Sequence, residues 1–506
     1  DSPDREVICA AWYRWGSGFA GRLRGAFAIA LYDQQACRLL LARDGMGVRP
    51  LFYARRGDSL IFASTLPALL AHPQVPPEVD RQGLYELLLL GPGRTPSLGV
   101  FRDVCSLEPG QQAAFDRKGL ALDVHWSLRD APWEGSFQQC ADRVRALVED
   151  SVERQLALPG EVCGFLSGGL DSSIICTLAA ARLGALNTRS VDYRDNQDYF
   201  RPGGFQPEAD GAYVALMRPT LPGEHKTVTL DTPELAQALG EAVDARGLPG
   251  MADVDASLLL LCRHTAGEGY AAALSGECAD EIFGGYPWYR TQALEGFPWA
   301  QNTELRAGYL RPEYRTWADP EEYVRSRYQQ AMDRVDILPE TGEDDRRIKR
   351  MMALNLNWFM QTLIDRNDRM GRAAGLGLRA PFCSEEIAQY LYTVPWRYKA
   401  YQGREKGLLR YAFQDKLPEE VAWRKKSPYP KTWNPSYRQA VTGLLREELD
   451  RPDCPLREFL RPEALEALLT EDSSVPWYGQ LMTTPQTIAY FWQMAHWFRQ
   501  FRVRLV

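Results

Sequence analysis

Short apolar runs alternate with helical patterns through the middle of this chain. Four runs have the length of a buried strand: residues 162–166, 188–193, 227–230 and 271–274. Helical periodicity surrounds them, notably over residues 138–156 and 174–183. Strands that alternate with helices predict a parallel sheet covered by helices, which is an α/β fold. Ligands bind such sheets at the carboxyl ends of the strands, so we expect a site there.

The first 125 residues have a different pattern. Apolar and polar residues alternate over residues 22–53, which predicts two strands joined by a turn at Gln34-Gln35 and a third strand at residues 50–53. Further strands are predicted at residues 60–63 and 111–115, and short helices at residues 66–71 and 82–90. We therefore expect a β-rich region with helices packed on it.

From Tyr286 onward the chain is mainly helical in pattern and rich in aromatic residues. Helices are predicted at residues 348–364, 384–393, 406–415 and 484–498. Residues 338–347 contain an acidic run, and we interpret them as an exposed linker or mobile loop.

The first apolar run leads into S-G-G-L-D-S-S, residues 167–173, and then into a helix. Two adjacent glycines let the backbone turn sharply and approach a ligand closely. A helix N-terminus after such a turn offers free N–H groups and the positive end of the helix dipole to an anion. Asp171 would repel a bare phosphate but suits a phosphate that arrives with Mg²⁺. The loop is not a G-x-x-x-x-G-K-[ST] loop, and an ordinary turn is the alternative interpretation.

Composition narrows the class of protein. A chain of 506 residues predicts two or three domains. A net charge of −7 argues against a nucleic-acid surface, and runs such as residues 87–90 and 258–262 are too short to span a bilayer. Ten cysteines without a C-x-x-C pair argue against a disulfide framework or zinc site. We expect a cytoplasmic protein with no nucleic-acid or membrane partner. The chain begins with Asp1, so the numbering is expected to start inside a longer gene product.

Two segments carry a resemblance to known enzymes. S-G-G-L-D-S-S resembles the pyrophosphate loop of enzymes that split ATP into AMP and pyrophosphate. L-A-R-D-G-M-G-V-R-P-L-F-Y, residues 41–53, resembles the L-A-R-D-R-x-G-x-K-P-L-Y-Y segment of class II glutamine amidotransferase domains. Those domains have a layered αββα fold and an N-terminal cysteine nucleophile. The resemblance covers the second half of such a domain, and the half with the cysteine is expected to be absent from this chain.

The first residues add a weaker resemblance. S-P-D-R-E-V, residues 2–7, is similar to the family's S-D-T-E-V, whose aspartate helps to hold glutamine. A proline is inserted here and Arg5 replaces threonine, so Asp4 as a glutamine contact and Asp4 as an exposed terminal acid both stay open. Either the rest of the glutaminase lies outside this chain, or the region has become a structural domain. We interpret Cys9 and Cys37 as buried small residues rather than nucleophiles.

A second loop strengthens the resemblance. S-G-E-C-A-D-E-I-F-G-G-Y, residues 275–286, meets every fixed position of the S-G-E-x-x-D-E-x-F-G-G-Y signature of asparagine synthetases. Three further segments of this chain resemble segments of that family: residues 365–382, 403–410 and 423–432. The resemblance implies a partial Ntn-type αββα glutaminase-like domain at residues 1–125. It also implies a parallel-sheet ATP-pyrophosphatase domain with a largely helical C-terminal part at residues 126–506.

The family's chemistry implies roles for the residues that would contact the phosphates of ATP. It implies that a carboxylate attacks the α-phosphate of ATP and that pyrophosphate leaves into the first loop. Asp171 and Asp280 are expected to bind Mg²⁺, and Lys426 is expected to meet the α-phosphate. Lys425 and Lys431 lie close in sequence, so Lys426 is favoured by alignment alone. Loop donors are expected from Ser167, Gly168, Gly169, Ser172 and Ser173.

Other roles concern ammonia and adenine. Glu277 matches the glutamate proposed to take the proton from attacking ammonia, and a base is needed because an ammonium ion cannot attack. Adenine contacts are implied at Leu166, Val191, Ser275 and Gly276, although an apolar core predicts similar residue types.

Two positions depart from the family pattern. Gly377 replaces the glutamate of G-L-E-x-R-x-P-F, and Ser384 replaces an aspartate that often follows P-F-L. Loss of a carboxylate near the acceptor could change the accepted carboxylate or amine, or the change could be neutral. Both interpretations stay open.

The resemblance predicts an ATP-dependent amide-forming ligase. It would adenylate a small carboxylate, aspartate first, and transfer ammonia from glutamine or solution, releasing AMP and pyrophosphate. The alternatives are a specialised amidotransferase with another carboxylate or amine, a β-lactam-synthetase-like cyclising relative, and a non-catalytic scaffold. Cyclising relatives replace the base at the position of Glu277, and a scaffold would be expected to have lost loop residues that are present here. A homodimer is left open.

Overall fold

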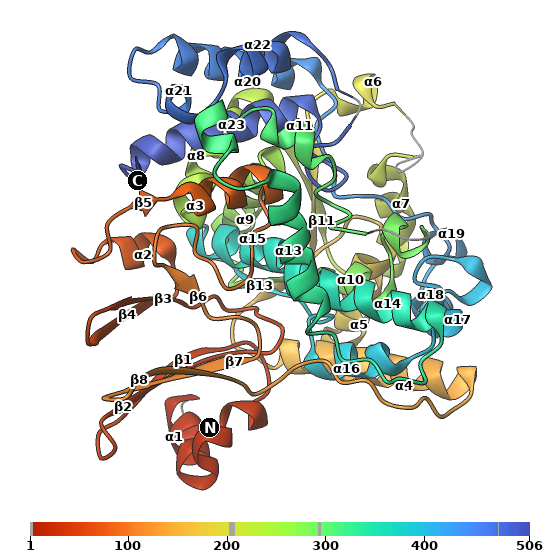
Figure 1. Cartoon of the computed structure of the whole chain (residues 1–506). Coiled ribbons are helices and arrows are strands. Elements are labelled where there is room, and N and C mark those ends of the chain that lie inside the picture. Colours follow the sequence, from red (N-terminus) through yellow and green to blue (C-terminus); the bar gives the residue numbers. More distant parts are fainter. Residues whose placement is uncertain (1–3, 202–207, 292–294, 474) are drawn as a thin grey trace.

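The computed structural model describes residues 4–201, 208–291, 295–473 and 475–506. Its first part stacks four layers in the order helix, sheet, sheet, helix (Figure 1). Helix α1 (Asp4–Trp15) covers an antiparallel sheet of order β1-β2-β7-β8, and α2 (Leu66–Leu70) and α3 (Arg81–Tyr85) lie beyond a second sheet of order β4-β3-β6. The strands are β1 (Ala28–Asp33), β2 (Arg38–Arg43), β3 (Phe52–Arg56), β4 (Ser59–Ala63), β6 (Cys105–Ser106), β7 (Gln111–Asp116) and β8 (Gly119–Val124).

The pattern of apolar residues explains this layering. Leu41, Tyr53 and Ala113 are buried in a cluster shared by the two sheets. Phe19 and Ile29 belong to a second cluster under α1. Because side chains alternate across a strand, one strand can supply both layers of the core. The predicted strands in this region are confirmed, and α1 was not predicted.

A five-stranded parallel sheet organises the second part. Its strand order is β11-β10-β9-β12-β13, so the chain leaves β9 towards β10 on one side and later returns to β12 on the other. Such a reversal of direction opens a crevice at the carboxyl ends of the strands. The strands are β9 (Val162–Phe165), β10 (Thr188–Tyr193), β11 (His225–Leu230), β12 (Ala272–Leu274) and β13 (Gly377–Arg379).

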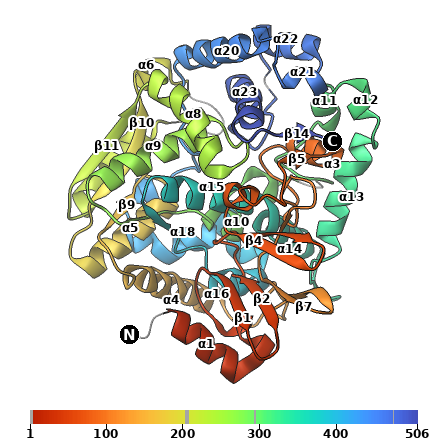
Figure 2. The same cartoon turned by 90° about the vertical axis from the view of Figure 1, so that its left-hand side faces the viewer.

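Helices cover both faces of this sheet and form the rest of the chain (Figure 2). Around the sheet lie α4 (Phe137–Leu156), α5 (Leu170–Leu183), α7 (Asp210–Met217), α8 (Thr232–Arg246), α9 (Asp253–Gly267), α10 (Ala279–Phe283) and α15 (Met360–Ala373). The other long helices are α13 (Pro320–Met332), α14 (Glu343–Leu354), α16 (Glu385–Thr393), α18 (Gly407–Phe413), α20 (Pro435–Asp450), α22 (Pro462–Thr470) and α23 (Thr484–Gln500). No helix of the described residues has the length and apolar character needed to cross a bilayer.

Two predictions from the sequence are wrong. Residues 338–347 are not a loose linker, because the Leu338 N–H and the Thr341 hydroxyl each donate to Asp130 at 2.9 Å. The acidic run forms the first turn of α14, where the helix dipole favours negative charge. Cys9 and Cys37 are exposed rather than buried.

The layered part and the sheet part touch over several direct contacts. Arg49 forms an ion pair with Asp368 on α15 at 2.5 Å, and the Gly45 N–H donates to Glu385 at 2.8 Å. The C-terminal strand β14 (Arg504–Leu505) pairs in parallel with β5 (Glu78–Val79). Figure 2 shows β14 and β5 side by side next to α3. The last described residues are therefore bound to the first part of the chain.

Candidate active site

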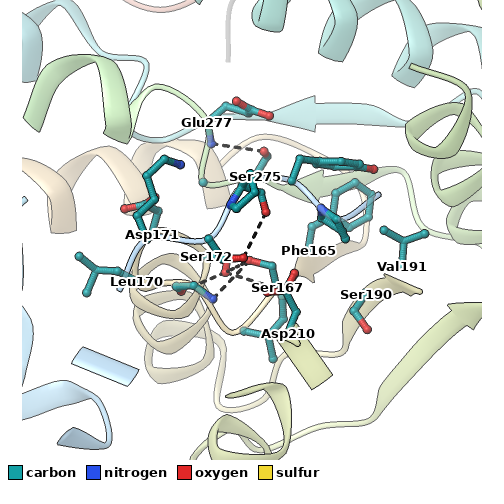
Figure 3. Close-up of a pocket in the computed structure, with 18 of the residues that line it drawn as sticks. Phe165, Ser167, Leu170, Asp171, Ser172, Ser190, Val191, Asp210, Ser275 and Glu277 are labelled. Atoms are coloured by element: carbon teal, nitrogen blue, oxygen red, sulfur yellow. Dashed lines mark hydrogen bonds between the residues drawn. The ribbon is translucent and has the colours of Figure 1, made fainter. Parts of the chain in front are cut away.

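Two loops at the carboxyl ends of adjacent strands line one cavity of about 420 Å³. The first loop follows β9 and contains Ser167, and the second follows β12 and contains Ser275. Figure 3 shows Asp171 and Ser172 of the first loop beside Ser275 and Glu277 of the second. The crevice expected from the strand order is thus a cavity of this structure, and its size suits a nucleotide.

Two glycines allow close packing of the loops, one against the other loop and one against α7. A Cβ on Gly276 would lie 2.9 Å from the Asp171 Cβ and from the Ser172 backbone nitrogen. Gly168 has a φ of +66°, and a Cβ there would lie 2.6 Å from the Tyr213 Cβ. A larger residue at Gly276 would push the two loops apart, and a larger residue at Gly168 would push the first loop away from α7.

The first loop presents donors at the N-terminus of α5. The first helical hydrogen bond recorded there runs from the Ser173 N–H to the Gly169 carbonyl at 3.0 Å, so earlier N–H groups of the helix remain for a ligand. The Ser167 and Ser172 hydroxyls lie 3.0 Å apart, and the Ser167 N–H donates to the Ser172 Oγ at 3.2 Å. The free N–H groups at the N-terminus of α5 are the feature that binds anions.

A cluster of four charges lies between the two loops. Lys406 Nζ is 2.6 Å from Asp171 Oδ2 and 2.9 Å from Asp280 Oδ1, and Lys426 Nζ is 2.7 Å from Asp280 Oδ2. Burial would raise the pKa of Asp280, but Lys406 and Lys426 outweigh burial and hold that pKa well below its usual range. Burial would likewise lower the pKa of Lys406, and Asp171 and Asp280 reverse this. Asp280 and Lys406 are therefore held in their charged forms, whereas burial, with Asp280 beside it, raises the pKa of Asp171 although Lys406 opposes this.

The two carboxylates also fit a divalent cation. Mg²⁺ prefers oxygen ligands and commonly takes one or two carboxylates together with phosphate oxygens. Asp280 Oδ1 is buried and makes no well-aligned hydrogen bond within the described residues. Those residues contain no group of three or more His, Cys, Asp or Glu side chains that could hold a metal ion. The donor set thus suits a metal that arrives with a polyphosphate.

Glu277 forms an ion pair with Arg366 of α15. The Glu277 side chain is 21% exposed and lines the cavity, whereas the Arg366 side chain is 3% exposed and lies 5.3 Å from the Tyr429 ring centroid. The hydrogen bond uses Glu277 Oε1, and no protein partner of Oε2 is recorded among the described residues. A carboxylate held in this way keeps one oxygen directed at the cavity's contents.

Most of the residues predicted from the sequence line the cavity, and two do not. Leu166, Val191 and Gly276 line the cavity as expected for adenine contacts. Gly168 and Ser173 do not line it: the Gly168 backbone packs on α7, and the fully buried Ser173 hydroxyl has no recorded partner. The other predicted residues all line the cavity, namely Ser167, Gly169, Asp171, Ser172, Ser275, Glu277, Asp280 and Lys426.

Three cavity residues were missed by the sequence analysis. Lys406 has a φ of +52°, a conformation rare outside glycine, which places its ammonium between the two loops. Arg366 contacts Glu277, and Arg424 donates to the Ser167 carbonyl at 3.3 Å. Each lies on a segment that resembles the family, so the segments pointed to the site while the individual residues did not.

The two departures from the family pattern lie outside the cavity lining. Gly377 is exposed on the edge strand β13, and its N–H donates to the Ala271 carbonyl at 2.9 Å, near the start of the strand pair. Ser384 is the N-cap residue of α16. Neither position therefore lines the cavity.

Comparison with known proteins identifies the family. The family model described as asparagine synthase matches residues 143–499, well over half of the chain. This chain belongs to the asparagine synthase family. A second family model, described as a glutamine amidotransferase domain, matches residues 1–126.

Relatives of the asparagine synthase family match most of the chain. Glutamine-hydrolyzing asparagine synthetase 3 of Bacillus subtilis is 40% identical over 510 residues, covering 99% of this chain and 83% of that protein. Glutamine-hydrolyzing asparagine synthetase 1 of the same organism is 27% identical over 460 residues, covering 84% and 71%. Among solved structures, the match to NMN synthetase from Francisella tularensis covers 30% of this chain and 60% of the NMN synthetase chain, with 17% sequence identity and a TM-score of 0.19. That structural likeness is too weak to support an argument.

Members of the asparagine synthase family are carbon–nitrogen ligases. The predicted fold class and the predicted enzyme class are therefore confirmed. The domain boundary at residues 125 and 126 and the roles of individual residues stay predictions.

Proposed function

We propose that this chain activates a small carboxylate with ATP and Mg²⁺ and converts the product to an amide. The carboxylate oxygen attacks the α-phosphorus, an acyl-adenylate forms, and the bond to pyrophosphate breaks. Ammonia then attacks the acyl carbon, the bond to AMP breaks, and the proton from the nitrogen passes to a base. AMP and pyrophosphate leave with the amide.

The observation that carries this proposal is the four-charge cluster at the N-terminus of α5. Lys406 and Lys426 neutralise Asp171 and Asp280 within 3 Å in each case. A triphosphate brings negative charge and Mg²⁺ brings positive charge, so the bound complex can replace these contacts without leaving a buried charge unpaired. When bound, Mg²⁺ supplies Lewis-acid stabilisation of the leaving pyrophosphate, and Asp171 and Asp280 would hold it.

The lysines then serve the α- and β-phosphates. Lys426 reaches the cluster from residues 423–432, and its ammonium lies 5.1 Å from the Tyr286 ring centroid. A compact ammonium stabilises charge that develops on phosphoryl oxygens more than it stabilises the starting state. We assign Lys426 to the transferring α-phosphate and Lys406 to the departing pyrophosphate.

Glu277 is the proposed base for the amine step. Its carboxylate faces the cavity from the second loop, and Arg366 fixes its orientation. The proton released when ammonia attacks the acyl-adenylate moves to Glu277. Retention of this carboxylate supports an amine-using ligase over a cyclising relative.

The names of the relatives make aspartate the first acceptor to test and glutamine or ammonia the first nitrogen sources. A different carboxylate is the second candidate. It is favoured by the apolar residues that line the cavity beyond Glu277, among them Trp288 and Phe359.

The test is pyrophosphate release with Mg-ATP and ammonium chloride, in the presence and absence of each carboxylate. We expect release that depends on one carboxylate and an amide product that carries ¹⁵N from labelled ammonium. Asp280→Asn should abolish release, while Asp244→Asn, a partly exposed acid on α8 outside the cavity lining, should not. Binding of ATP without release for any carboxylate and amine would overturn the proposal.

A further inference from the structure

The main chain that carries Lys426 is bound at three points by side chains of residues 404–410. Each contact uses a main-chain atom of the lysine-bearing segment, either a carbonyl or the N–H of Lys426 itself. We call these three contacts the main-chain bracket. They run from the Lys426 N–H to Glu405 Oε1 at 3.2 Å, from Arg404 Nη2 to the Trp423 carbonyl at 2.6 Å and from Arg410 Nη1 to the Ala422 carbonyl at 2.6 Å.

Both carboxylate oxygens of Glu405 have protein partners. Oε1 accepts from the Lys426 N–H and from Arg410 Nη2 at 3.0 Å, and Oε2 accepts from Arg290 Nη1 at 3.2 Å. Burial alone would raise the pKa of Glu405, but Arg410, the Lys426 N–H and Arg290 outweigh burial and lower that pKa below its usual value. The Glu405 side chain is 12% exposed and does not line the cavity. Glu405 is therefore an ionised acceptor for the main chain, away from any substrate.

Glu405 is followed directly by Lys406, whose ammonium bridges Asp171 and Asp280. Lys426 Nζ lies 2.7 Å from the other oxygen of Asp280. Two adjacent residues thus set both ammonium groups, because Lys406 acts with its own side chain and Glu405 holds the main chain of Lys426. A displacement of Glu405 would change how the two ammonium groups are spaced around Asp280.

The anchoring of the main chain matters for Lys426 because a lysine side chain is long. A flexible four-carbon stem separates the ammonium from the backbone, so the ammonium is placed only as well as the main chain is held. A misplacement of about 1 Å at a reacting centre can lower a rate about 100-fold. The bracket therefore bears on the rate of the proposed reaction more than on the affinity for ATP.

We propose that Glu405 is a positioning residue, which fixes Lys426 for adenylyl transfer by holding its main chain. This inference rests on the proposed function, in which Lys426 meets the α-phosphate. Glu405 touches neither the nucleotide nor the acceptor, and it acts only through Lys426. Loss of the Glu405 carboxylate slows the reaction and leaves the binding of ATP nearly unchanged.

The first experiment replaces one carboxylate oxygen. Glu405→Gln keeps the size of the side chain, but an amide has a single acceptor oxygen and cannot serve all three donors. Pyrophosphate release is measured with Mg-ATP, ammonium and the carboxylate that supports release in wild type. We expect kcat to fall at least ten-fold and KM for ATP to change less than three-fold. An unchanged kcat in the folded variant would overturn the inference.

Glu448→Gln is the matched control. The Glu448 side chain is 10% exposed, accepts from Arg499 at 2.7 Å and 3.0 Å, and lies outside the cavity lining. Its replacement should lower Tm as the replacement of Glu405 does, yet leave kcat within two-fold. A ten-fold fall in kcat for both variants would reveal a general loss of structure and would overturn the inference.

A double variant tests whether Glu405 acts through Lys426. In a Lys426→Met background the ammonium is gone, so Glu405→Gln should lower kcat further by less than two-fold. A further ten-fold loss in that background would mean that Glu405 acts by another route, and it would overturn the inference.

Chemical labelling separates this inference from the proposed function, because it needs no turnover. Acetic anhydride acylates the uncharged amine, so an ion-paired lysine reacts slowly, and peptide mass spectrometry follows the reaction. Measured relative to Lys226, which is 46% exposed, acylation of Lys426 should be at least five-fold faster in Glu405→Gln than in wild type and unchanged in Glu448→Gln. Such a rise without pyrophosphate release for any carboxylate would support the inference and sink the proposed function alone. An unchanged rate in Glu405→Gln would overturn the inference.

Arg404→Met takes the place of Glu405→Gln if that variant does not fold. It removes the bracket contact to the Trp423 carbonyl and leaves Glu405 in place. We expect a smaller effect in the same direction, namely a kcat lower by about three-fold and acylation of Lys426 faster by about two-fold. Wild-type values for both quantities would then overturn the inference.

Discussion

The two ends of the cavity solve opposite physical problems. At the phosphate end, Asp171, Asp280, Lys406 and Lys426 bring four charges together, and each charge has an opposite partner within 3 Å. At the other end lie apolar residues that we call the apolar wall, namely Tyr286, Trp288, Phe359, Leu363 and Leu481. The Tyr286 hydroxyl and the Trp288 indole N–H already have protein partners. One end is prepared for charge that arrives with ATP, whereas the wall residues carry no charge.

Under the proposed function, the charges that serve the nucleotide are separated along the cavity from its apolar lining. The charge cluster can be complete in any enzyme that transfers an adenylyl group, because the nucleotide is always the same. The wall can change without disturbing the cluster, because Tyr286 is the only wall residue recorded in contact with one of the four charges among the described residues. Variants at each end should therefore have distinct effects.

The largest effect is expected at Lys426. Lys426→Met should lower kcat for pyrophosphate release at least 100-fold, a loss of about 2.7 kcal/mol of transition-state stabilisation, because Lys426 is the ammonium that the proposed function assigns to the α-phosphate. Lys431→Met is the matched control: Lys431 lies 5.0 Å from the Trp433 ring centroid and does not line the cavity. A similar loss of activity in both variants would contradict the assignment that alignment alone had favoured.

A large effect on stability is expected at Lys406. Lys406→Met leaves Asp171 and Asp280 facing each other without the central ammonium, and removal of one partner from a buried ion pair costs about 3–5 kcal/mol. We expect Tm to fall without metal and to recover when millimolar Mg²⁺ is added, because the cation replaces the lost charge. The wild-type Tm should hardly respond to Mg²⁺ alone, and scanning calorimetry reads both quantities. A Tm that Mg²⁺ does not raise in the variant would argue against a metal between these carboxylates.

A smaller, pH-dependent effect is expected at Asp253, a buried carboxyl outside the cluster. Burial raises its pKa to about 6, and Gln486 and Lys431 oppose this only in part. The folded protein then holds this proton more tightly than the unfolded chain, so the contribution to stability is complete below pH 3.8 and is lost as the pH rises through 6. The loss is on the order of 3 kcal/mol.

Asp253→Asn tests that expectation, because asparagine resembles the protonated carboxyl group. The variant should gain stability over wild type between pH 4 and pH 7, measured as the difference in Tm across that range. Asp280→Asn should behave in the opposite way, because the lysines lower the pKa of Asp280: its loss of stability relative to wild type should grow as the pH rises towards 3.8 and stay constant across the neutral range. If the difference in Tm from wild type depended on pH in the same way for both variants, the pKa values of Asp253 and Asp280 would not be shifted in opposite directions.

The smallest effect is expected at Gly377. A Cβ there would meet the Ala271 carbonyl at 3.4 Å and the Ala272 Cβ at 3.7 Å, which are ordinary contacts, and the residue is exposed. Gly377→Glu should therefore leave the ranking of acceptors unchanged and kcat/KM within two-fold in the carboxylate panel. A changed ranking would show that this edge position affects the choice of acceptor.

The same division explains what the sequence could predict. The loops after β9 and β12 each follow an apolar run, and each is one unbroken stretch of sequence. The motifs and the strand pattern together therefore pointed to Asp171, Asp280 and Glu277 as cavity residues. Of the sheet, β13 was missed because three residues in a glycine-rich segment are too short to form a pattern. The residues at 338–347 were misjudged because an acidic run looks the same on a loop and at a helix N-terminus.

The apolar wall was beyond prediction for a different reason. Trp288, Phe359 and Leu481 come from three distant segments, and each is an apolar residue of the kind that fills any core. Only the folded chain shows that they share a cavity. Lys406 was missed similarly, since its approach to Asp171 depends on an uncommon backbone conformation at the start of α18.

The pairing of β14 with β5 has a consequence for biosynthesis. On the ribosome, Glu78 and Val79 emerge more than four hundred residues before Arg504 and Leu505, so this edge of the layered part stays open during most of translation. Any residues that follow Val506 would have to leave past that edge, where the Val506 N–H donates to the Val79 carbonyl at 3.1 Å. A reporter joined at this position through a long spacer should therefore disturb the pairing less than one joined directly.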